Sequence, residues 1–282
     1  MRMTILLIDA GATKTEFTLL SEGKIIFRHS GLGINPNYCA EAEMMRVFSE
    51  FVAHCPDTGA ISKIFYYGAG CASARNASLM EGLMANFFPC ADIKVYSDLV
   101  AVCHALSMGQ ASVISILGTG SASCLFNGEE ISNRAPSLGY MLGDEGSGTN
   151  LGKRLLTAYL RGLLPADLAQ ELERTYDLTF EKVIHRLYKE PEPNQLMSQL
   201  SPFIQKHIDQ PFMRKLTLEA FCDFFATQKI YYPDGLFWHL SGSVAYYFRD
   251  IIKQAAEMEQ CKLGMIVAAP MEKLIDYYKK RK

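Results

Sequence analysis

Short apolar runs recur along the chain, and their length separates them from the longer amphipathic stretches between them. Each run contains β-branched residues and is bounded by Gly, Pro or Asp, which predicts a buried strand rather than a helix. The runs are residues 5–8, 64–67, 113–117 and 265–268. The stretches with helical spacing are residues 41–55, 77–88 and 99–107. Strands that alternate with helices predict an α/β fold.

The middle of the chain has a different pattern. From residue 151 to about residue 231 it is rich in leucine at helical spacing, and Glu190-Pro-Glu-Pro-Asn194 interrupts it as a surface loop. We expect a helical segment here, then a strand at 236–240 and a helix from 241–245 to about residue 260. Residues 272–280 are apolar on one side and need a partner surface.

Two segments about a hundred residues apart resemble each other. Residues 7–19 precede the turn Glu22-Gly23, and residues 115–126 precede the turn Asn127-Gly128. Each segment predicts a strand, a turn of small and hydroxyl residues, a second strand and a hairpin. Coincidence is the alternative, because such turns are common between strands. The repeat predicts two similar halves, each with one Gly/Thr/Ser turn.

The two turns have the composition of phosphate sites. Glycine lets a backbone N–H approach an anion closely, and hydroxyls and a lysine add donors and positive charge. The turns are Gly11-Ala-Thr-Lys-Thr15 and Gly118-Thr-Gly-Ser121. The chain has no complete Walker-type loop, and no Gly-x-Gly-x-x-Gly follows a strand, so the common nucleotide loops are not indicated. Ordinary hairpin turns remain the alternative.

Composition excludes several classes of function. The 282 residues carry a formal net charge of −2 and 21% charged residues, which argues against a nucleic-acid footprint. The basic run Lys279-Lys-Arg-Lys282 is typical of a solvated helix end. The start has no signal-peptide pattern and no run is long enough to span a membrane, so we expect a soluble cytoplasmic protein. The eight cysteines lack metal or disulfide spacing and are expected to be reduced.

These motifs together resemble the actin, hexokinase and Hsp70 superfamily. The two turns resemble its first and second phosphate motifs, Asp9 included, and Gly242-Ser-Val-Ala245 resembles its adenosine motif. The most specific match is Leu138-Gly-Tyr-Met-Leu-Gly-Asp-Glu-Gly-Ser147, which is close to the substrate motif of N-acetylglucosamine kinases among the BadF/BadG/BcrA/BcrD-type ATPases. The resemblance covers nearly the whole chain and is weakest from about residue 161 to 231.

The resemblance implies an α/β fold of two ribonuclease-H-like, actin-like ATPase domains that flank a cleft. The first domain would be residues 1–108. The second would be residues 109–270, with the helical segment 151–231 inserted in it. The C-terminal helix, residues 271–282, would pack on the first domain. Dimerisation is common among such proteins, so a homodimer is also expected from the resemblance.

The resemblance also implies a kinase that uses ATP and Mg²⁺ to phosphorylate a hydroxyl of an amino sugar, most closely N-acetylglucosamine. Asp9 would hold Mg²⁺ through water, and Asp98 would be the general base. Without the family, Asp9 could be a turn former and Asp98 a helix cap. The residues that would bind ATP phosphates are Gly11, Thr13, Lys14, Thr15, Gly118, Thr119, Gly120 and Ser121. Those that would bind adenosine are Gly242 and Ser243.

Sugar recognition is expected from Asn35 and Asp144, with Asn37 as a rival for the role of Asn35. Amide and carboxylate groups suit vicinal hydroxyls, which are donor and acceptor at once. The rest of the substrate loop is Gly143, Glu145, Gly146 and Ser147. Leu138 stands where the animal kinase has Trp, and Pro36 stands where it has His. N-acetylmuramic acid, glucosamine and related sugars therefore stay open as substrates.

Two other functions remain open. The first is an activator ATPase of 2-hydroxyacyl-CoA dehydratases or benzoyl-CoA reductases, which holds a [4Fe–4S] cluster with paired cysteines. Cys71 and Cys103 lie in the matching half, but Gly118–Ser121 departs from the motif of those activators. The second is a sugar sensor without catalysis, against which the presence of both Asp9 and Asp98 argues.

Overall fold

The computed structural model describes residues 4–11 and 13–280 and divides into two compact units. Unit 1 is made of the chain up to Met108 together with the C-terminal stretch from Pro270, and unit 2 is Gly109–Ala269. Within the described residues, each unit contains one five-stranded sheet with helices, so the α/β fold class expected from the sequence is confirmed. Ala12 of the first phosphate motif and residues 281–282 of the basic run lie outside the described residues.

The sheet of unit 1 has the order β3-β2-β1-β4-β5. The first three strands along the chain form an antiparallel meander, and β4 and β5 run parallel to β1. The strands are β1 (Thr4–Ala10), β2 (Lys14–Ser21), β3 (Lys24–Leu32), β4 (Ile61–Gly68) and β5 (Asp92–Ser97). Glu22 and Gly23, which connect β2 to β3, have φ of 52° and 78°, as the tight hairpin predicted there requires.

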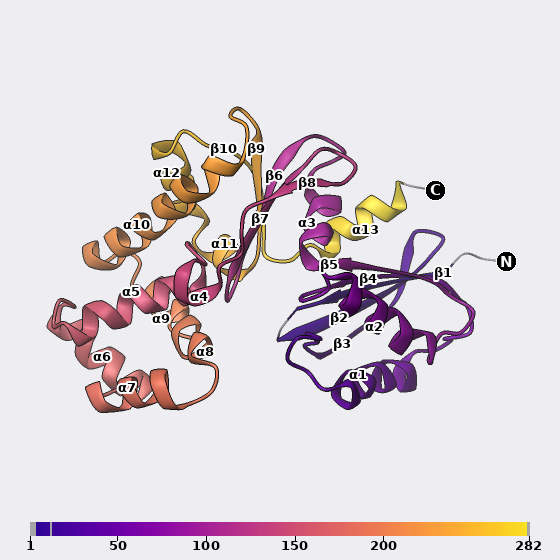
Figure 1. The fold of residues 1–282 in the computed structure, drawn as a ribbon, viewed down its shortest axis with the longest axis horizontal. Helices are drawn as coiled ribbons and strands as arrows, with labels where there is room; N and C mark the ends of the chain where they lie inside the picture. The colour runs from indigo at the N-terminus through magenta and orange to yellow at the C-terminus, as the bar shows by residue number, and fades with distance from the viewer. Residues whose placement is uncertain (1–3, 12, 281–282) are drawn as a thin grey trace. The chain divides into compact units, whose positions relative to one another are not determined.

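Helices cover both faces of this sheet. α1 (Glu41–His54) and α2 (Ala74–Ala85) cover one face, and α3 (Asp98–Leu106) and α13 (Met271–Lys279) cover the other (Figure 1). Leu6 and Ile8 of β1 belong to the core with α1 and α2. On the opposite face, the Tyr67 hydroxyl hydrogen-bonds to His104 Nδ1 over 2.8 Å and to the Tyr278 hydroxyl over 2.7 Å. The C-terminal helix is thereby attached to β4 and α3.

The sheet of unit 2 repeats the arrangement of unit 1. Its order is β10-β9-β6-β7-β8, in which β6, β7 and β8 form the antiparallel meander and β9 and β10 add in parallel. The strands are β6 (Ser112–Leu117), β7 (Ser121–Phe126), β8 (Ile131–Arg134), β9 (Phe237–Ser241) and β10 (Lys262–Val267). The repeat seen in the sequence therefore corresponds to two sheets with the same order of strands.

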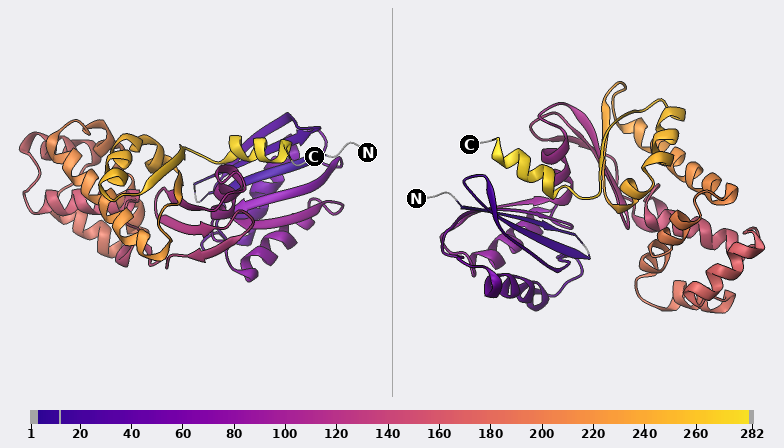
Figure 2. Two further views of the ribbon diagram at one scale, coloured as in Figure 1. Left: turned by 90° about the horizontal axis from the view of Figure 1, so that it is seen from above. Right: turned by 180° about the vertical axis from the view of Figure 1, so that it is seen from behind.

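Most of the helices belong to unit 2, and one group lies beyond α5, away from the sheet (Figure 2). The helices are α4 (Gly139–Leu142), α5 (Gly148–Leu160), α6 (Ala166–Tyr176), α7 (Phe180–Lys189), α8 (Pro193–Ser198), α9 (Ser201–Lys206), α10 (Pro211–Gln228), η1 (Lys229–Tyr231), α11 (Ser243–Tyr247) and α12 (Arg249–Met258). The core joins α10 to the sheet, because the rings of Phe224 and Phe225 pack edge-on against Trp238 of β9. α5 packs closely on α8, because a Cβ at Gly152 would lie 1.9 Å from the Met197 carbonyl oxygen.

Three local features differ from the sequence prediction. β5 was not predicted, because its apolar residues alternate with polar ones at the edge of the sheet. α2 begins at Ala74 rather than at residue 77, because the Ser73 side chain accepts the Asn76 N–H and caps the helix. The helix expected from residue 241 to about 260 is two helices, and they meet at Phe248.

None of the helices within residues 4–11 and 13–280 combines the length and the apolar character that a membrane crossing requires. The cysteines are free thiols in the structure, and Cys71 and Cys103 are buried.

Candidate active site

Three carboxylates of unit 1 lie near the carboxyl end of β1. Asp9 is on the sheet face that α3 covers, Glu16 is its cross-strand partner on β2, and Asp98 is the first residue of α3. Burial raises the pKa of the Asp9 carboxyl to about 7, and the negative charges of Glu16 and Asp98 act in the same direction. Lys14 opposes them in part. The fold therefore holds Asp9 in a place that is unfavourable for its own negative charge and suited to a cation.

Replacing Asp9 with Asn is expected to stabilise the protein at pH 8 in metal-free buffer, by roughly 2 kcal/mol. The folded-state pKa lies above the unfolded value, so the stability contributed by Asp9 is present below about pH 4 and is lost as the pH rises through 7. Asn is neutral throughout and avoids this loss. Denaturant unfolding between pH 4 and pH 8 checks it, and a difference from the wild type that does not change with pH would contradict the interpretation.

Asp98 is placed at a helix start as well as beside Asp9. Its Oδ1 accepts the backbone N–H of Leu99 over 2.8 Å, so it contributes to the start of α3. A carboxylate has several acceptor sites, so this bond is compatible with a role as a base. The pKa of the nearby Cys71 thiol is raised to about 12, mainly by burial. The negative charge of the partly exposed Asp98 is the second cause of this rise.

The first turn offers fewer donors than its sequence suggests. The Gly11 N–H donates to the Lys14 carbonyl oxygen over 2.9 Å, which closes the turn between β1 and β2. Thr13 is exposed, and Lys14 Nζ lies 2.6 Å from Glu16 Oε1. Thr15 is fully buried, and its hydroxyl has no hydrogen-bond partner among the described residues. Among the described residues of this turn, the accessible donors are therefore those of Thr13 and Lys14.

The second turn is bonded to the predicted sugar loop. The N–H groups of Gly148 and Thr149, at the start of α5, donate to the carbonyl oxygens of Gly118 and Thr119 over 2.8 and 3.1 Å. The Ser121 N–H donates to Asp144 Oδ1 over 3.2 Å. Gly120 lies beside that carboxylate, since a Cβ there would be 3.0 Å from Asp144 Oδ2. Residues 118–121 and 144–149 therefore form one connected substructure.

Some residues of the sugar loop are buried and determine its conformation, and others are partly exposed. Gly146 has a φ of +70°, and a Cβ there would lie 2.9 Å from Phe224 Cβ, so the position favours glycine. Ser147 is fully buried, and its hydroxyl accepts the Asn150 N–H as the cap of α5. Asp144 and Glu145 are partly exposed, and burial raises the pKa of the Asp144 carboxyl. Gly143 is buried beside them.

A cavity of about 440 Å³ is lined by three of the six predicted nucleotide residues of unit 2, whereas Gly120, Ser121 and Gly242 are not part of its lining. Gly118, Thr119 and Ser243 all line it. Glycine at position 242 lets the backbone before Ser243 pass close to Leu117. Gly242 has a φ of +120°, and a Cβ there would lie 2.2 Å from the Leu117 carbonyl oxygen. Val244 of the adenosine motif also lines the cavity, and the lining residues that the sequence did not indicate are Gly148, Ser198, Gln199, Ser201, Pro202, Gln205, Tyr247 and Phe248. Five of them lie between Ser198 and Gln205, in the part of the chain where the family resemblance is weakest.

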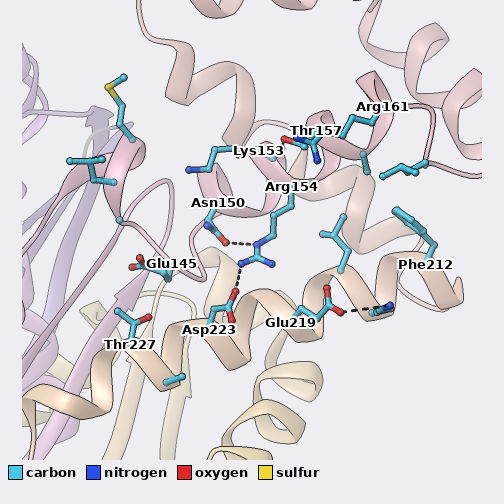
Figure 3. A pocket seen from close by; sticks show the side chains of 18 residues that line it. Glu145, Asn150, Lys153, Arg154, Thr157, Arg161, Phe212, Glu219, Asp223 and Thr227 are labelled. Carbon is cyan, nitrogen blue, oxygen red and sulfur yellow. Dashed lines mark hydrogen bonds and ion pairs between the residues drawn. The ribbon is translucent and has the colours of Figure 1, made fainter.

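A larger cavity of about 910 Å³ lies between α5 and α10 and reaches Gly143 and Glu145 of the sugar loop (Figure 3). Its charged residues largely neutralise one another. Arg154 donates to Asn150 Oδ1 over 3.1 Å and forms an ion pair with Asp223 (Figure 3). This cavity could not be predicted from the sequence, because most of its residues are distributed along two helices far apart in the chain.

Asn35 lies in the loop between β3 and α1. Its Oδ1 accepts the Asn37 N–H over 3.0 Å, and its carbonyl oxygen accepts the N–H groups of Tyr38 and Cys39. The structure thus gives each unit its own group of predicted residues. In unit 1 these are the acids Asp9 and Asp98, the first turn and the Asn35 loop. In unit 2 they are the second turn, the sugar loop and Ser243.

In the part of the chain that the structure describes, no three His, Cys, Asp or Glu side chains are grouped to hold a metal ion. A site for Mg²⁺ would therefore depend on one or two carboxylates together with water and ligand oxygens, which is a common arrangement for this ion.

The chain is similar to solved structures over almost its entire length. A proposed N-acetylglucosamine kinase from Porphyromonas gingivalis has 34% identity, with 98% of this chain and 99% of that chain covered and a TM-score of 0.92. A second proposed N-acetylglucosamine kinase, from Chromobacterium violaceum, has 17% identity, 98% of each chain covered and a TM-score of 0.76. No protein-family model and no curated protein sequence matches the chain.

A protein with a different activity has the same fold. Component A of (R)-2-hydroxyglutaryl-CoA dehydratase from Acidaminococcus fermentans has 14% identity, with 99% of this chain and 100% of that chain covered and a TM-score of 0.52. At this identity, as at 17%, the likeness shows the fold alone, and a fold by itself does not select an activity.

Proposed function

The chain belongs to the N-acetylglucosamine kinase-like family of actin-like ATPase-fold proteins, and from this premise we propose that it transfers the γ-phosphoryl group of ATP to a hydroxyl of an amino sugar, with N-acetylglucosamine as the first candidate. The observation that carries the proposal is the cavity of about 440 Å³, where Gly118, Thr119 and Ser243 meet. Hydrogen bonds connect the same turn to the loop of Asp144.

In the proposed complex, ATP occupies this cavity. The base lies against α11 and α9, and the phosphates lie at the turn of Gly118 to Ser121. In unit 1, Thr13 and Lys14 are assigned as donors to phosphate oxygens. Backbone N–H groups and hydroxyls of such turns suit phosphate oxygens. Gln199, Gln205 and Tyr247 line the cavity with exposed side chains, so a planar base has an aromatic ring and two amides available.

Replacing Tyr247 with Ala is expected to raise the KM for ATP about fivefold and to leave the KM for sugar unchanged, because stacking on an aromatic ring contributes about 1 kcal/mol. Steady-state kinetics with each substrate varied in turn measure this. Tyr246→Ala is the matched control, since the Tyr246 ring faces Arg249 at 5.0 Å and is not part of the cavity lining. Equal effects of the two substitutions would exclude Tyr247 from base binding.

Mg²⁺ fits the Asp9 region by charge. Asp9 is a carboxylate whose charge is opposed by burial, Glu16 and Asp98, so a bound cation would relieve that cost. We assign the metal to Asp9, with water completing the contact. When bound, the ion would neutralise phosphate charge, which phosphoryl transfer requires.

For the sugar, we assign Asp98 as the general base that accepts the proton of the attacking hydroxyl. In unit 2, Asp144 and Glu145 are assigned to sugar recognition, while Gly146 and Ser147 shape their loop. In unit 1, Asn35 is assigned to sugar recognition. The Asp144 carboxylate is already fixed by the Ser121 N–H, so it is held in place before the sugar binds. Positioning and charge neutralisation are the main requirements of this reaction.

An ADP-release assay with Mg-ATP and a sugar panel tests the proposal. The panel is N-acetylglucosamine, N-acetylmannosamine, N-acetylmuramic acid, glucosamine and glucose. We expect ADP release that depends on an amino sugar. ADP release that is the same with and without every sugar would refute the kinase and favour the activator ATPase.

The activator alternative is not favoured by the cysteines. Cys71 is 4% exposed and Cys103 is 0% exposed, whereas a cluster shared between subunits needs accessible thiolates. The raised pKa of the Cys71 thiol also opposes thiolate formation. A protein that binds sugar but releases no ADP would instead support the sensor alternative.

A further inference from the structure

Three asparagines of unit 1 connect the Asn35 loop, which lies between β3 and α1, to α2. Asn35 and Asn37 are in the loop after β3, and Asn76 is in the first turn of α2. The Asn37 N–H donates to Asn35 Oδ1 over 3.0 Å. Asn76 Nδ2 donates to Asn37 Oδ1 and to the Gly70 carbonyl oxygen, over 2.8 Å in each case. Both hydrogens of the Asn76 amide are therefore in use.

Backbone groups fix the orientation of all three side-chain amides. The Gly70 carbonyl can only accept, so the Asn76 atom beside it is the nitrogen. That nitrogen can only donate, so the Asn37 atom facing it is the oxygen. The Asn37 backbone N–H can only donate, so the Asn35 atom facing it is also the oxygen. The usual ambiguity between amide nitrogen and oxygen is thereby removed.

With both oxygens engaged, Asn35 and Asn37 have their Nδ2 groups to offer to a ligand. Neither of these nitrogens donates to another group among the described residues. The two amides lie close together against Gly70, because a Cβ there would be 2.3 Å from Asn35 Oδ1 and 2.8 Å from Asn37 Nδ2. Gly70 also has a φ of +79°, so both the backbone conformation and the lack of space for a side chain favour glycine at this position. The loop is therefore a surface of two donors that suits oxygen acceptors.

We propose that Asn76 is the positioning residue of the Asn35 loop, and that Asn37 joins Asn35 in donating to acceptor oxygens of the sugar. Asn76 holds Asn37 by its oxygen and keeps the Asn37 nitrogen available to the ligand. Asn76 touches no substrate and acts through Asn37. The inference rests on the proposed function and deepens it, because it makes hydroxyl or acyl oxygens the groups that this loop recognises.

The test is a set of kinetic measurements that separate sugar binding from ATP binding. Loss of one neutral donor contact lowers affinity about tenfold. We expect Asn76→Ala and Asn37→Ala each to raise the KM for the amino sugar about tenfold, with kcat and the KM for ATP within about twofold of wild type. The double variant should be no worse than Asn37→Ala alone, since Asn76 acts through Asn37.

Asn76→Asp provides a variant of the same size, which places an oxygen opposite two acceptors and should impair sugar binding at least as much as Asn76→Ala. Asn86→Ala is the matched control, because Asn86 is exposed at the other end of α2. Thermal unfolding of each variant shows that it is folded under assay conditions.

The outcomes separate this inference from the proposed function. Sugar-dependent ADP release by the wild type with an unchanged sugar KM in Asn76→Ala would overturn the inference alone. So would equal rises in the KM values for sugar and ATP, or additive effects in the double variant. A wild type that neither binds amino sugars by calorimetry nor phosphorylates them would overturn both.

Discussion

Asp98→Asn is expected to lower kcat about a thousandfold while the protein still folds and binds sugar. A general base contributes about 10² to 10⁴ in rate, and an amide cannot accept the proton. Asn has nearly the same shape as Asp, and its oxygen can still accept the Leu99 N–H, so α3 should begin as before. Loss of activity without loss of structure would separate the base role of Asp98 from its role at the helix start.

Single-turnover and steady-state ADP release measure the rate, and calorimetry measures sugar binding. Asp92→Asn is the matched control, because Asp92 is an exposed acid at the start of β5 with only a surface ion pair to Lys94 at 3.5 Å. We expect the control to retain wild-type rates. An Asp98→Asn rate within tenfold of wild type would remove Asp98 from the base role.

Gly152→Ala is expected to destabilise the protein by several kcal/mol, although alanine favours helices over glycine by about 1 kcal/mol. The new Cβ would lie 1.9 Å from the Met197 carbonyl oxygen and 2.5 Å from the Met197 carbonyl carbon. These atoms are backbone and cannot rotate away, so α5 and α8 would have to separate. Because Ser198 follows in α8, the cavity that Ser198 lines should also be distorted.

Urea unfolding measures the effect as a lower midpoint. Gly82→Ala is the control, since it is also a glycine inside a helix and a Cβ there meets no described atom within 4 Å. It should stabilise the protein by about 0.5–1 kcal/mol. Opposite signs at the two positions are expected, and stabilisation by both substitutions would show that α5 and α8 do not pack as closely as described.

The sequence predicted the class of fold because its strongest signals are local. The run at residues 113–117 is apolar on both faces, and Gly23 and Gly128 mark tight turns, so the strands and hairpins around them could be identified. β5 was missed because it has no continuous apolar run, and Ile93 is the one buried apolar side chain among its six residues. The break between α11 and α12 at Phe248 was missed because the sequence has no Pro or Gly at this point.

The candidate site was predicted where motifs are contiguous and was missed where they are not. Asp9, Gly118 and Asp144 belong to compact motifs, whereas Asn76 is significant only because Gly70 and Asn37 lie beside it in the fold. Thr15 and Ser147 have the residue type of ligand-binding groups, yet both are buried, and the Ser147 hydroxyl caps a helix. Burial and tertiary proximity are not encoded in residue type alone.

The shared order of the two sheets has an evolutionary consequence. In each sheet, the second cross-strand pair from the turn joins the first two strands of the meander. This pair is Asp9 and Glu16 on β1 and β2, and it is Ile116 and Ala122 on β6 and β7. The acidic pair thus occurs in one copy of the repeated unit and is replaced by small or apolar residues in the other. If the halves descend from a duplicated segment, selection kept the backbone of both copies and let their charges diverge. An ancestor with two identical halves would have carried two acidic centres or none.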